Sequence, residues 1–174
     1  MKRRIEANNQ RKAEAMFNLG VYYTEGLGVE RNEIDAARWF QKAATLGHVN
    51  AQYRLGVAYA TGSGLKQNRA KAVKWYRKVA NLGHVNAQYN LGFYFEHGLG
   101  VKQSYRVAAK WYRKAADQGH ANSQHRMGVF YNKGWGVPIN LAKAEYWRQK
   151  SALQDNHDAQ RKLAPRSRKE SHPA

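Results

Sequence analysis

The fold is decided by residues 15–50, which read AMFNLGVYYTEGLGVERNEIDAARWFQKAATLGHVN. The pattern recurs three more times at a strict spacing of 36 residues, so Gly20 returns as Gly56, Gly92 and Gly128. The tryptophans keep the same spacing at Trp39, Trp75, Trp111 and Trp147. Four repeats therefore occupy residues 15–50, 51–86, 87–122 and 123–158 without insertion or deletion. A fixed period of this length indicates units that stack on their neighbours to bury a continuous core.

Each repeat is predicted to contain two helices. Residues 15–25 place Ala15, Leu19, Tyr22 and Tyr23 on one face, which we expect to pack in the core. The loop Gly26-Leu27-Gly28 ends this helix, because glycine adopts left-handed backbone angles at little cost. The second helix, residues 33–46, is expected to bury Trp39 and its alanines. Its predicted N-cap residues in the four repeats are Asn32, Asn68, Ser104 and Asn140.

The junctions between repeats carry a glycine, a histidine and a polar residue. Gly47, Gly83 and Gly119 are predicted to end second helices. The predicted N-caps of the following first helices are Asn50, Asn86, Asn122 and Asp158. His48, His84 and His120 are expected to be turn residues. They are not expected to share a metal ion, because packed helices lie about 10 Å apart whereas zinc ligands lie about 2 Å from the ion.

The two ends of the chain differ from the repeats. Residues 1–14 are predicted to form a basic N-terminal cap. Near the other end Asp155 replaces the terminating glycine, and residues 159–164 are expected to begin a capping helix that stops at Pro165. Residues 159–174 thus comprise this cap and a basic tail, which is polar and expected to be disordered.

Composition narrows the class of protein. The chain has 174 residues and no cysteine, which excludes disulfides, thiolate catalysis and cysteine-bound metal. No apolar run approaches the roughly 20 residues that span a bilayer, and the first ten residues do not form a signal peptide. We expect a cytoplasmic protein if the chain is complete, and a periplasmic or secreted one if a leader was removed. The formal charge of +18 favours an anionic partner.

The repeat resembles the Sel1-like repeat family. Repeat one carries its pattern A-x-x-x-L-G-x-x-Y-x-x-G-x-G-V, followed by A-x-x-W-x-x-K-A-A-x-x-G, and the likeness spans the four repeats, about 144 of 174 residues. The resemblance implies an all-α, right-handed superhelix (a solenoid related to tetratricopeptide arrays) and adaptor or scaffold work in bacteria, without a shared active site. One departure is that Asn or Ser stands where the family often has Asp before the second helix, which keeps the N-cap but removes a charge.

The first helices are expected to line a concave groove that binds a partner. Arginine and asparagine there suit peptide backbone or carboxylate groups, and aromatic residues supply rigid contact area. The candidate groove residues are Phe17, Asn18, Tyr53, Arg54, Tyr89, Asn90, Phe93, His97, His125, Arg126 and Lys133. The alternative for the tyrosines, and for the valines at 21, 57 and 129, is packing against the neighbouring first helix.

The second helices are expected to carry a basic convex stripe opposite the tryptophans. Its residues are Arg38, Lys42, Lys74, Arg77, Lys78, Lys110, Arg113 and Lys114. Such a row can follow a phosphate backbone, but it is also what a solvated helix face looks like, and Lys42 and its equivalents belong to the repeat pattern.

These features predict a monomeric, non-enzymatic scaffold that binds an acidic protein or peptide in its groove, as a bacterial regulator or as an inhibitor or immunity protein. No catalytic residue, cofactor or metal is predicted. The alternative function is binding of nucleic acid or another anionic surface by the convex stripe. The basic clusters at the termini would add to it: Lys2, Arg3, Arg4, Arg161, Lys162, Arg166, Arg168 and Lys169.

Overall fold

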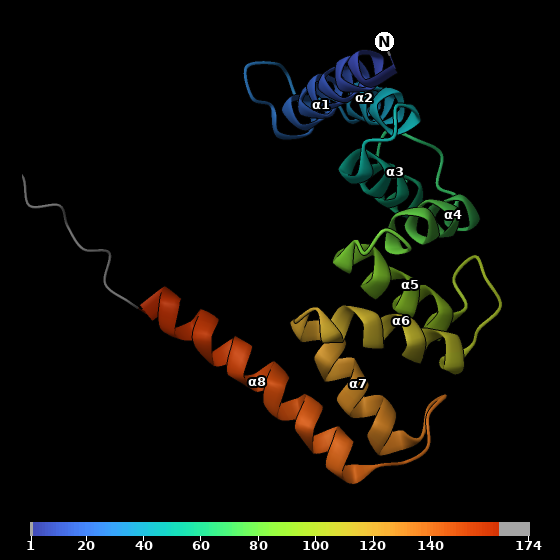
Figure 1. Ribbon diagram of the computed structural model, residues 1–174, viewed down its shortest axis with the longest axis vertical. Coiled ribbons are helices and arrows are strands. Elements are labelled where there is room, and N and C mark those ends of the chain that lie inside the picture. Colours follow the sequence, from blue (N-terminus) through green and yellow to red (C-terminus); the bar gives the residue numbers. More distant parts are fainter. Residues whose placement is uncertain (1, 164–174) are drawn as a thin grey trace, which may run out of the picture.

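The structure is a computed structural model that describes residues 2–163 and the side chains of residues 4–154. Within residues 2–163 the chain forms helices and loops, without a β-strand. The helices are α1 (Lys2–Glu25), α2 (Glu33–Thr45), α3 (Val49–Thr61), α4 (Arg69–Ala80), α5 (Val85–His97), α6 (Tyr105–Asp117), α7 (Ala121–Lys133) and α8 (Leu141–Leu163). They stack as four pairs along a curved array (Figure 1), and the extensive packing is between helices consecutive in the chain. The predicted all-α solenoid is confirmed.

The glycine loops and the second-helix caps are as predicted. Gly62, Gly98 and Gly134 end α3, α5 and α7 in the left-handed conformation, with φ of 86°, 67° and 70°. The Asn32 side chain accepts the backbone N–H groups of Ile34 and Asp35 at the start of α2. Asn68, Ser104 and Asn140 accept the equivalent N–H groups of Lys71, Val107 and Lys143.

The first helices of later repeats are capped by histidine, so the prediction of Asn50, Asn86 and Asn122 as N-caps is wrong. The N-cap residues of α3, α5 and α7 are His48, His84 and His120. The Nδ1 atoms of these rings accept backbone N–H groups at 3.1–3.2 Å, from Ala51, Ala87 and Ser123. The predicted asparagines lie inside the first helical turn, past the position from which a side chain can cap.

Both ends of the array are more helical than predicted. Because α1 begins at Lys2, the segment expected to be a separate cap before residue 15 continues the first helix. At the other end α8 runs to Leu163 without a break at Asp155. Asp158 therefore lies inside α8 and is no N-cap, and the predicted capping helix is the end of α8. Pro165 and the predicted disordered tail, residues 164–174, lie outside the described residues.

In the first three repeats, an aromatic residue that follows the tryptophan packs the two helices of the repeat together. Phe40, Tyr76 and Tyr112 are at most 5% exposed. They lie against the glycine of the Leu-Gly pair, and a Cβ placed on Gly92 would be 2.5 Å from the Tyr112 ring. This glycine therefore lets the helices approach closely.

The first repeat does not bury the face predicted to lie in the core. Ala15 is exposed, Leu19 and Tyr23 are half-buried, and Tyr22 is 45% exposed. The equivalent residues of the third repeat, Ala87, Leu91 and Tyr94, are at most 8% exposed. The difference arises because α3, α5 and α7 each pack on the preceding second helix, whereas no described helix precedes α1.

Candidate protein-binding faces

Three of the four aromatic or histidine side chains that form one column of the predicted groove pack against other residues of the array. Phe17, Tyr53 and Tyr89 are half-buried and lie 5.7–5.9 Å, between ring centroids, from the second-helix rings Phe40, Tyr76 and Tyr112. On their other side they contact the capping histidines of the next repeat, His48, His84 and His120, at 4.4–4.8 Å. They therefore hold the caps in place and join repeats. The fourth member of the column, His125, is exposed.

The column of alternating asparagine and arginine divides into exposed and engaged members. Asn18 and Arg54 are exposed. Asn90 is half-buried, and its Nδ2 donates to the Tyr53 hydroxyl at 3.4 Å. Arg126 is half-buried, with its guanidinium paired to Glu96.

Glu96 is a structural residue that the sequence did not reveal. It is 3% exposed, and the Tyr112 hydroxyl donates to its Oε2 at 2.7 Å. Burial raises the pKa of Tyr112, so this hydroxyl keeps its proton and remains a donor. Since Glu96, Tyr112 and Arg126 belong to α5, α6 and α7, the network joins the third repeat to the fourth. The one signal in the sequence is that Glu96 departs from the repeat pattern, since the equivalent positions hold Thr24, Ala60 and Asn132.

Arg54 borders a small cleft between the first two repeats. The cleft has a volume of about 110 Å³ and is formed by the end of α1, the start of α2 and the middle of α3. Its lining residues include Thr24, Phe40, Arg54, Val57 and Ala58. Glu33 and Ser63 line it too, so the cleft combines one cation and one carboxylate with apolar side chains.

Three further groove candidates are exposed on α5 and α7. Phe93 is 37% exposed and meets the His97 ring edge-on at 4.3 Å, and Lys133 ends α7. We use the term first-helix face for the exposed members of the predicted groove: Asn18, Arg54, Phe93, His97, His125 and Lys133. Neither α3 nor α7 contains an acidic residue, and the only one in α5 is the buried Glu96.

All eight residues of the predicted convex stripe are exposed on the second helices. Lys42, Lys78 and Lys114 lie over the tryptophan rings of their own helices, with Nζ 4.1–5.4 Å from the ring centroids. Two members have carboxylate partners, Arg38 with Asp35 and Arg113 with Asp117. The hydrogen bond to Asp117 raises the pKa of Arg113.

The stripe is wider than the sequence indicated. Lys71 joins it beside Lys74 and Lys78, in a hollow with Tyr59 and Trp75 on its walls. Arg106 joins it in a second hollow, which is also lined by Lys110, Arg113, Lys114 and Tyr131. We call the eight predicted residues together with Arg69, Lys71 and Arg106, which are also exposed on second helices, the second-helix stripe. Of the terminal basic clusters, Arg4 is exposed on α1, and the other side chains lie outside those described.

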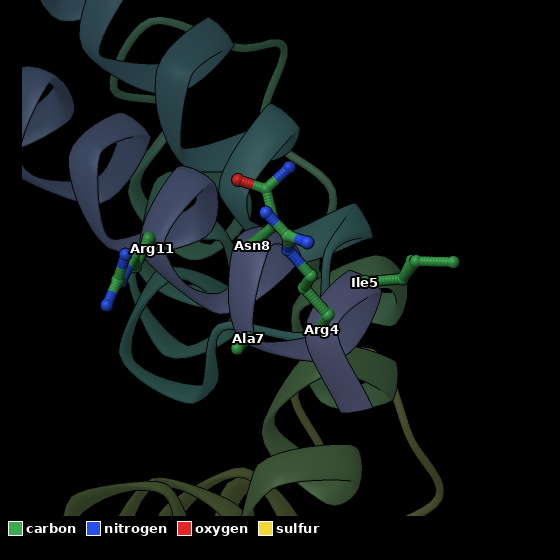
Figure 2. A pocket seen from close by; sticks show the side chains of 5 residues that line it. All are labelled: Arg4, Ile5, Ala7, Asn8 and Arg11. Atoms are coloured by element: carbon green, nitrogen blue, oxygen red, sulfur yellow. The ribbon is translucent and has the colours of Figure 1, made fainter. Parts of the chain in front are cut away.

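A hollow on α1 does not form an enclosed site. Figure 2 shows that its residues, Arg4, Ile5, Ala7, Asn8 and Arg11, all belong to α1, and that Ile5 and Arg11 point to opposite sides of that helix. In the described part of the chain no group of His, Asp or Glu side chains is arranged to hold a metal ion. Over the same residues, no helix has the length and apolarity needed to cross a membrane.

The family model of the Sel1 repeat matches this chain four times, at residues 13–48, 49–84, 85–120 and 121–156. The chain belongs to the Sel1 repeat family. Each match begins two residues before the boundary chosen from the sequence, at the same 36-residue period. Sel1 repeat proteins generally mediate protein–protein interactions and are generally non-catalytic scaffolds.

Solved Sel1 structures have the same fold. A Sel1 repeat protein from Oxalobacter formigenes is 36% identical, with a TM-score of 0.79 over 87% of this chain and 60% of its own. The antigen c5321 of uropathogenic Escherichia coli, which has an SLR fold, is also 36% identical, with a TM-score of 0.81 over 91% of this chain. This chain covers only 35% of that antigen, so both relatives are considerably longer. Cysteine-rich protein B of Helicobacter pylori, at 24% identity and a TM-score of 0.56, shares the fold alone, over 71% of this chain and 93% of its own. No curated protein sequence matches the chain.

Proposed function

We propose that this Sel1 repeat protein is a non-enzymatic scaffold that binds an acidic protein or peptide on its first-helix face. The observation that carries the proposal is the set of exposed cationic, amide and aromatic side chains on consecutive first helices, without an exposed carboxylate on α3, α5 or α7. An acidic chain laid across these helices meets a hydrogen-bond donor at each repeat and a cation, Arg54 or Lys133, at the second and the fourth. Because the solved relatives are bacterial proteins, a bacterial regulator or inhibitor is the narrower form of the proposal.

Affinity capture from a bacterial extract tests this function. The bait is the whole chain, compared with the double variant Arg54→Glu/Lys133→Glu, which reverses two exposed charges on the first-helix face. The matched control, Lys66→Glu/Lys102→Glu, makes the same change in net charge in two exposed loops. We expect the wild type and the loop variant to retain the same acidic protein and the face variant to lose it. Equal retention by all three baits would contradict the proposal.

A second candidate function is nucleic-acid binding by the second-helix stripe. Residues 36–95 contain nine Lys or Arg and no Asp or Glu. Among the eleven side chains of the stripe, only Arg38 and Arg113 are paired with a carboxylate of the described residues. Exposed and uncompensated cations in successive helices are what a phosphate backbone requires.

Fluorescence anisotropy with a labelled 30-nucleotide single strand tests the second function. Binding should weaken steeply between 50 and 200 mM salt, because each neutralised phosphate releases a counterion. Lys74→Glu/Lys110→Glu should reduce both affinity and salt slope more than the loop pair Lys66→Glu/Lys102→Glu. If the two variants lose affinity equally, net charge rather than the stripe binds the strand.

A further inference from the structure

The three junctions between repeats bring together equivalent positions, and they differ in charge. Each junction combines a residue near the end of a first helix, the aromatic residue of the second helix, and a residue of the next first helix. The first junction contains Thr24, Phe40 and Arg54, the second Ala60, Tyr76 and Asn90, and the third Glu96, Tyr112 and Arg126. A comparison of the three junctions shows which combinations of side chains can be accommodated there.

The third junction contains its own carboxylate. Glu96 is almost completely buried, accepts the Tyr112 hydroxyl and pairs with Arg126. The Arg126 guanidinium also lies over the Tyr112 and Phe130 rings, 6.0 and 5.8 Å from their centroids. A carboxylate is therefore stable here when arginine faces it from the next repeat and aromatic rings surround the pair.

The second junction is neutral. Ala60 replaces the glutamate and Asn90 replaces the arginine. The Asn90 amide is used within the protein, since it donates to the Tyr53 hydroxyl at 3.4 Å. This junction leaves no charge that a partner would need to neutralise.

The first junction keeps the arginine but lacks the carboxylate. Thr24 stands where Glu96 stands, and its hydroxyl donates to the Gly20 carbonyl at 2.8 Å. Phe40 replaces the tyrosine and offers no hydrogen bond. Glu33 also lines the cleft, but its carboxylate pairs with Arg31 at 3.0 Å. Arg54 and Arg126 thus occupy equivalent positions, but Arg126 pairs with Glu96 whereas Arg54 borders an open cleft.

We propose that this cleft binds an aspartate or glutamate side chain of the acidic partner, with the carboxylate on the Arg54 guanidinium and the methylene groups against Phe40 and Val57. The inference rests on the proposed scaffold function and identifies Arg54 as the residue that recognises a negative charge of the partner. The partner's carboxylate takes the place that Glu96 takes in the third junction. Charge-assisted pairing of this kind is among the stronger hydrogen bonds of proteins.

A peptide titration tests the cleft directly. The probe is hexaglutamate, with hexaglutamine as the uncharged control, and the readout is the NMR signal of the Arg54 Nε–H group. Hexaglutamate should shift this signal and hexaglutamine should not. Thr24→Glu, which supplies an internal carboxylate, and Arg54→Gln should each weaken hexaglutamate binding about tenfold. Lys102→Gln removes the same charge from an exposed loop outside the first-helix face and should leave the affinity within about twofold of wild type.

Two results would overturn the assignment. One is an Arg54 signal that does not respond to hexaglutamate. The other is equal weakening by Arg54→Gln and Lys102→Gln, which would show attraction by net charge alone. Extract capture then separates the two levels of the proposal. A partner retained by wild type, Arg54→Gln and Thr24→Glu alike rejects the cleft and keeps the scaffold function, whereas an extract from which wild type retains no protein rejects the scaffold function itself.

Discussion

At the scale of single residues, a row of buried glutamines shows how closely the repeats depend on one another. Gln52, Gln88 and Gln124 each donate to a carbonyl at the end of the preceding second helix, at 3.1–3.2 Å. The carbonyl oxygens of Gln88 and Gln124 in turn accept the side-chain amides of Gln118 and Gln154. Among the described side chains, the Gln52 Oε1 atom is buried without a hydrogen-bond partner. The reason is that Leu82 stands at the position of Gln118 and Gln154.

Leu82→Gln should therefore stabilise the protein. Leu82 is 65% exposed, so its replacement removes little packing, and the new amide can reach Gln52 Oε1. We expect a gain of about 1 kcal/mol in the free energy of unfolding, the usual net contribution of one hydrogen bond, measured by urea denaturation. Leu46→Gln is the control, because Met16 stands where a buried glutamine would have to be. A gain of the same size in both variants would reject the explanation.

The second glycine of each loop gives another residue-scale prediction. Gly28 and Gly64 have nearly the same φ, 72° and 67°, but a Cβ on Gly64 would overlap the Glu33 carbonyl, whereas Gly28 has nothing within 4 Å. Gly28→Ala should cost about 1 kcal/mol from the left-handed backbone alone. Gly64→Ala should cost about 2 kcal/mol more, since the backbone of the preceding repeat must move. Equal losses in urea denaturation would mean that the contact between repeats contributes nothing.

At the scale of helices, the sequence predicted what the 36-residue period determines. The number of helix pairs, the ends of the first helices at Gly62, Gly98 and Gly134, and the N-caps of the second helices from Asn32 onward all follow from local rules that each repeat satisfies. The histidine caps were not predicted, because their rings depend on stacking against Phe17, Tyr53 and Tyr89 of a different repeat. The Glu96–Arg126 pair was missed for a similar reason, since it breaks the periodicity and joins helices that only the fold brings together.

The histidine caps make helix stability depend on pH. Burial lowers the pKa of His84 and of His120 below the ordinary value of about 6.5. The unfolded chain therefore binds protons more readily than the folded one. The contribution of these caps is complete above about pH 6.5 and is lost as the pH falls through the lower folded values. Protonation of Nδ1 removes the acceptor of the Ala87 and Ser123 N–H groups.

We expect the free energy of unfolding to fall by about 1 kcal/mol per cap between pH 7 and pH 5, measured by urea denaturation across that range. The variant His84→Asn/His120→Asn keeps a capping side chain that does not titrate, so it should flatten this pH dependence. A profile as steep in the variant as in the wild type would show that other groups cause it.

At the scale of the whole molecule, the charge is distributed unevenly along the array. The formal charge is +18, and between residues 36 and 144 the only acidic residues are Glu96 and Asp117, each paired with an arginine. Apart from Arg113, the exposed cations of α4 and α6, in neighbouring repeats, therefore have no carboxylate partner among the described side chains. Repulsion between them opposes stacking, while the glycine contacts and capping histidines favour it. An anionic partner on either face would relieve that repulsion and stabilise the array.

This balance predicts that salt stabilises the free protein. Raising NaCl from 20 to 300 mM screens exposed charges more than about 10 Å apart. It should increase stability by about 1 kcal/mol, or about 3 °C in Tm for a chain of this size, followed by circular dichroism. Lys74→Gln/Lys110→Gln removes two cations from adjacent second helices, so it should raise Tm at low salt and reduce the gain from salt. Lys66→Gln/Lys102→Gln, in the loops, is the control for net charge. If salt lowers Tm, or if both pairs respond alike, repulsion between the second helices does not limit the stability of the array.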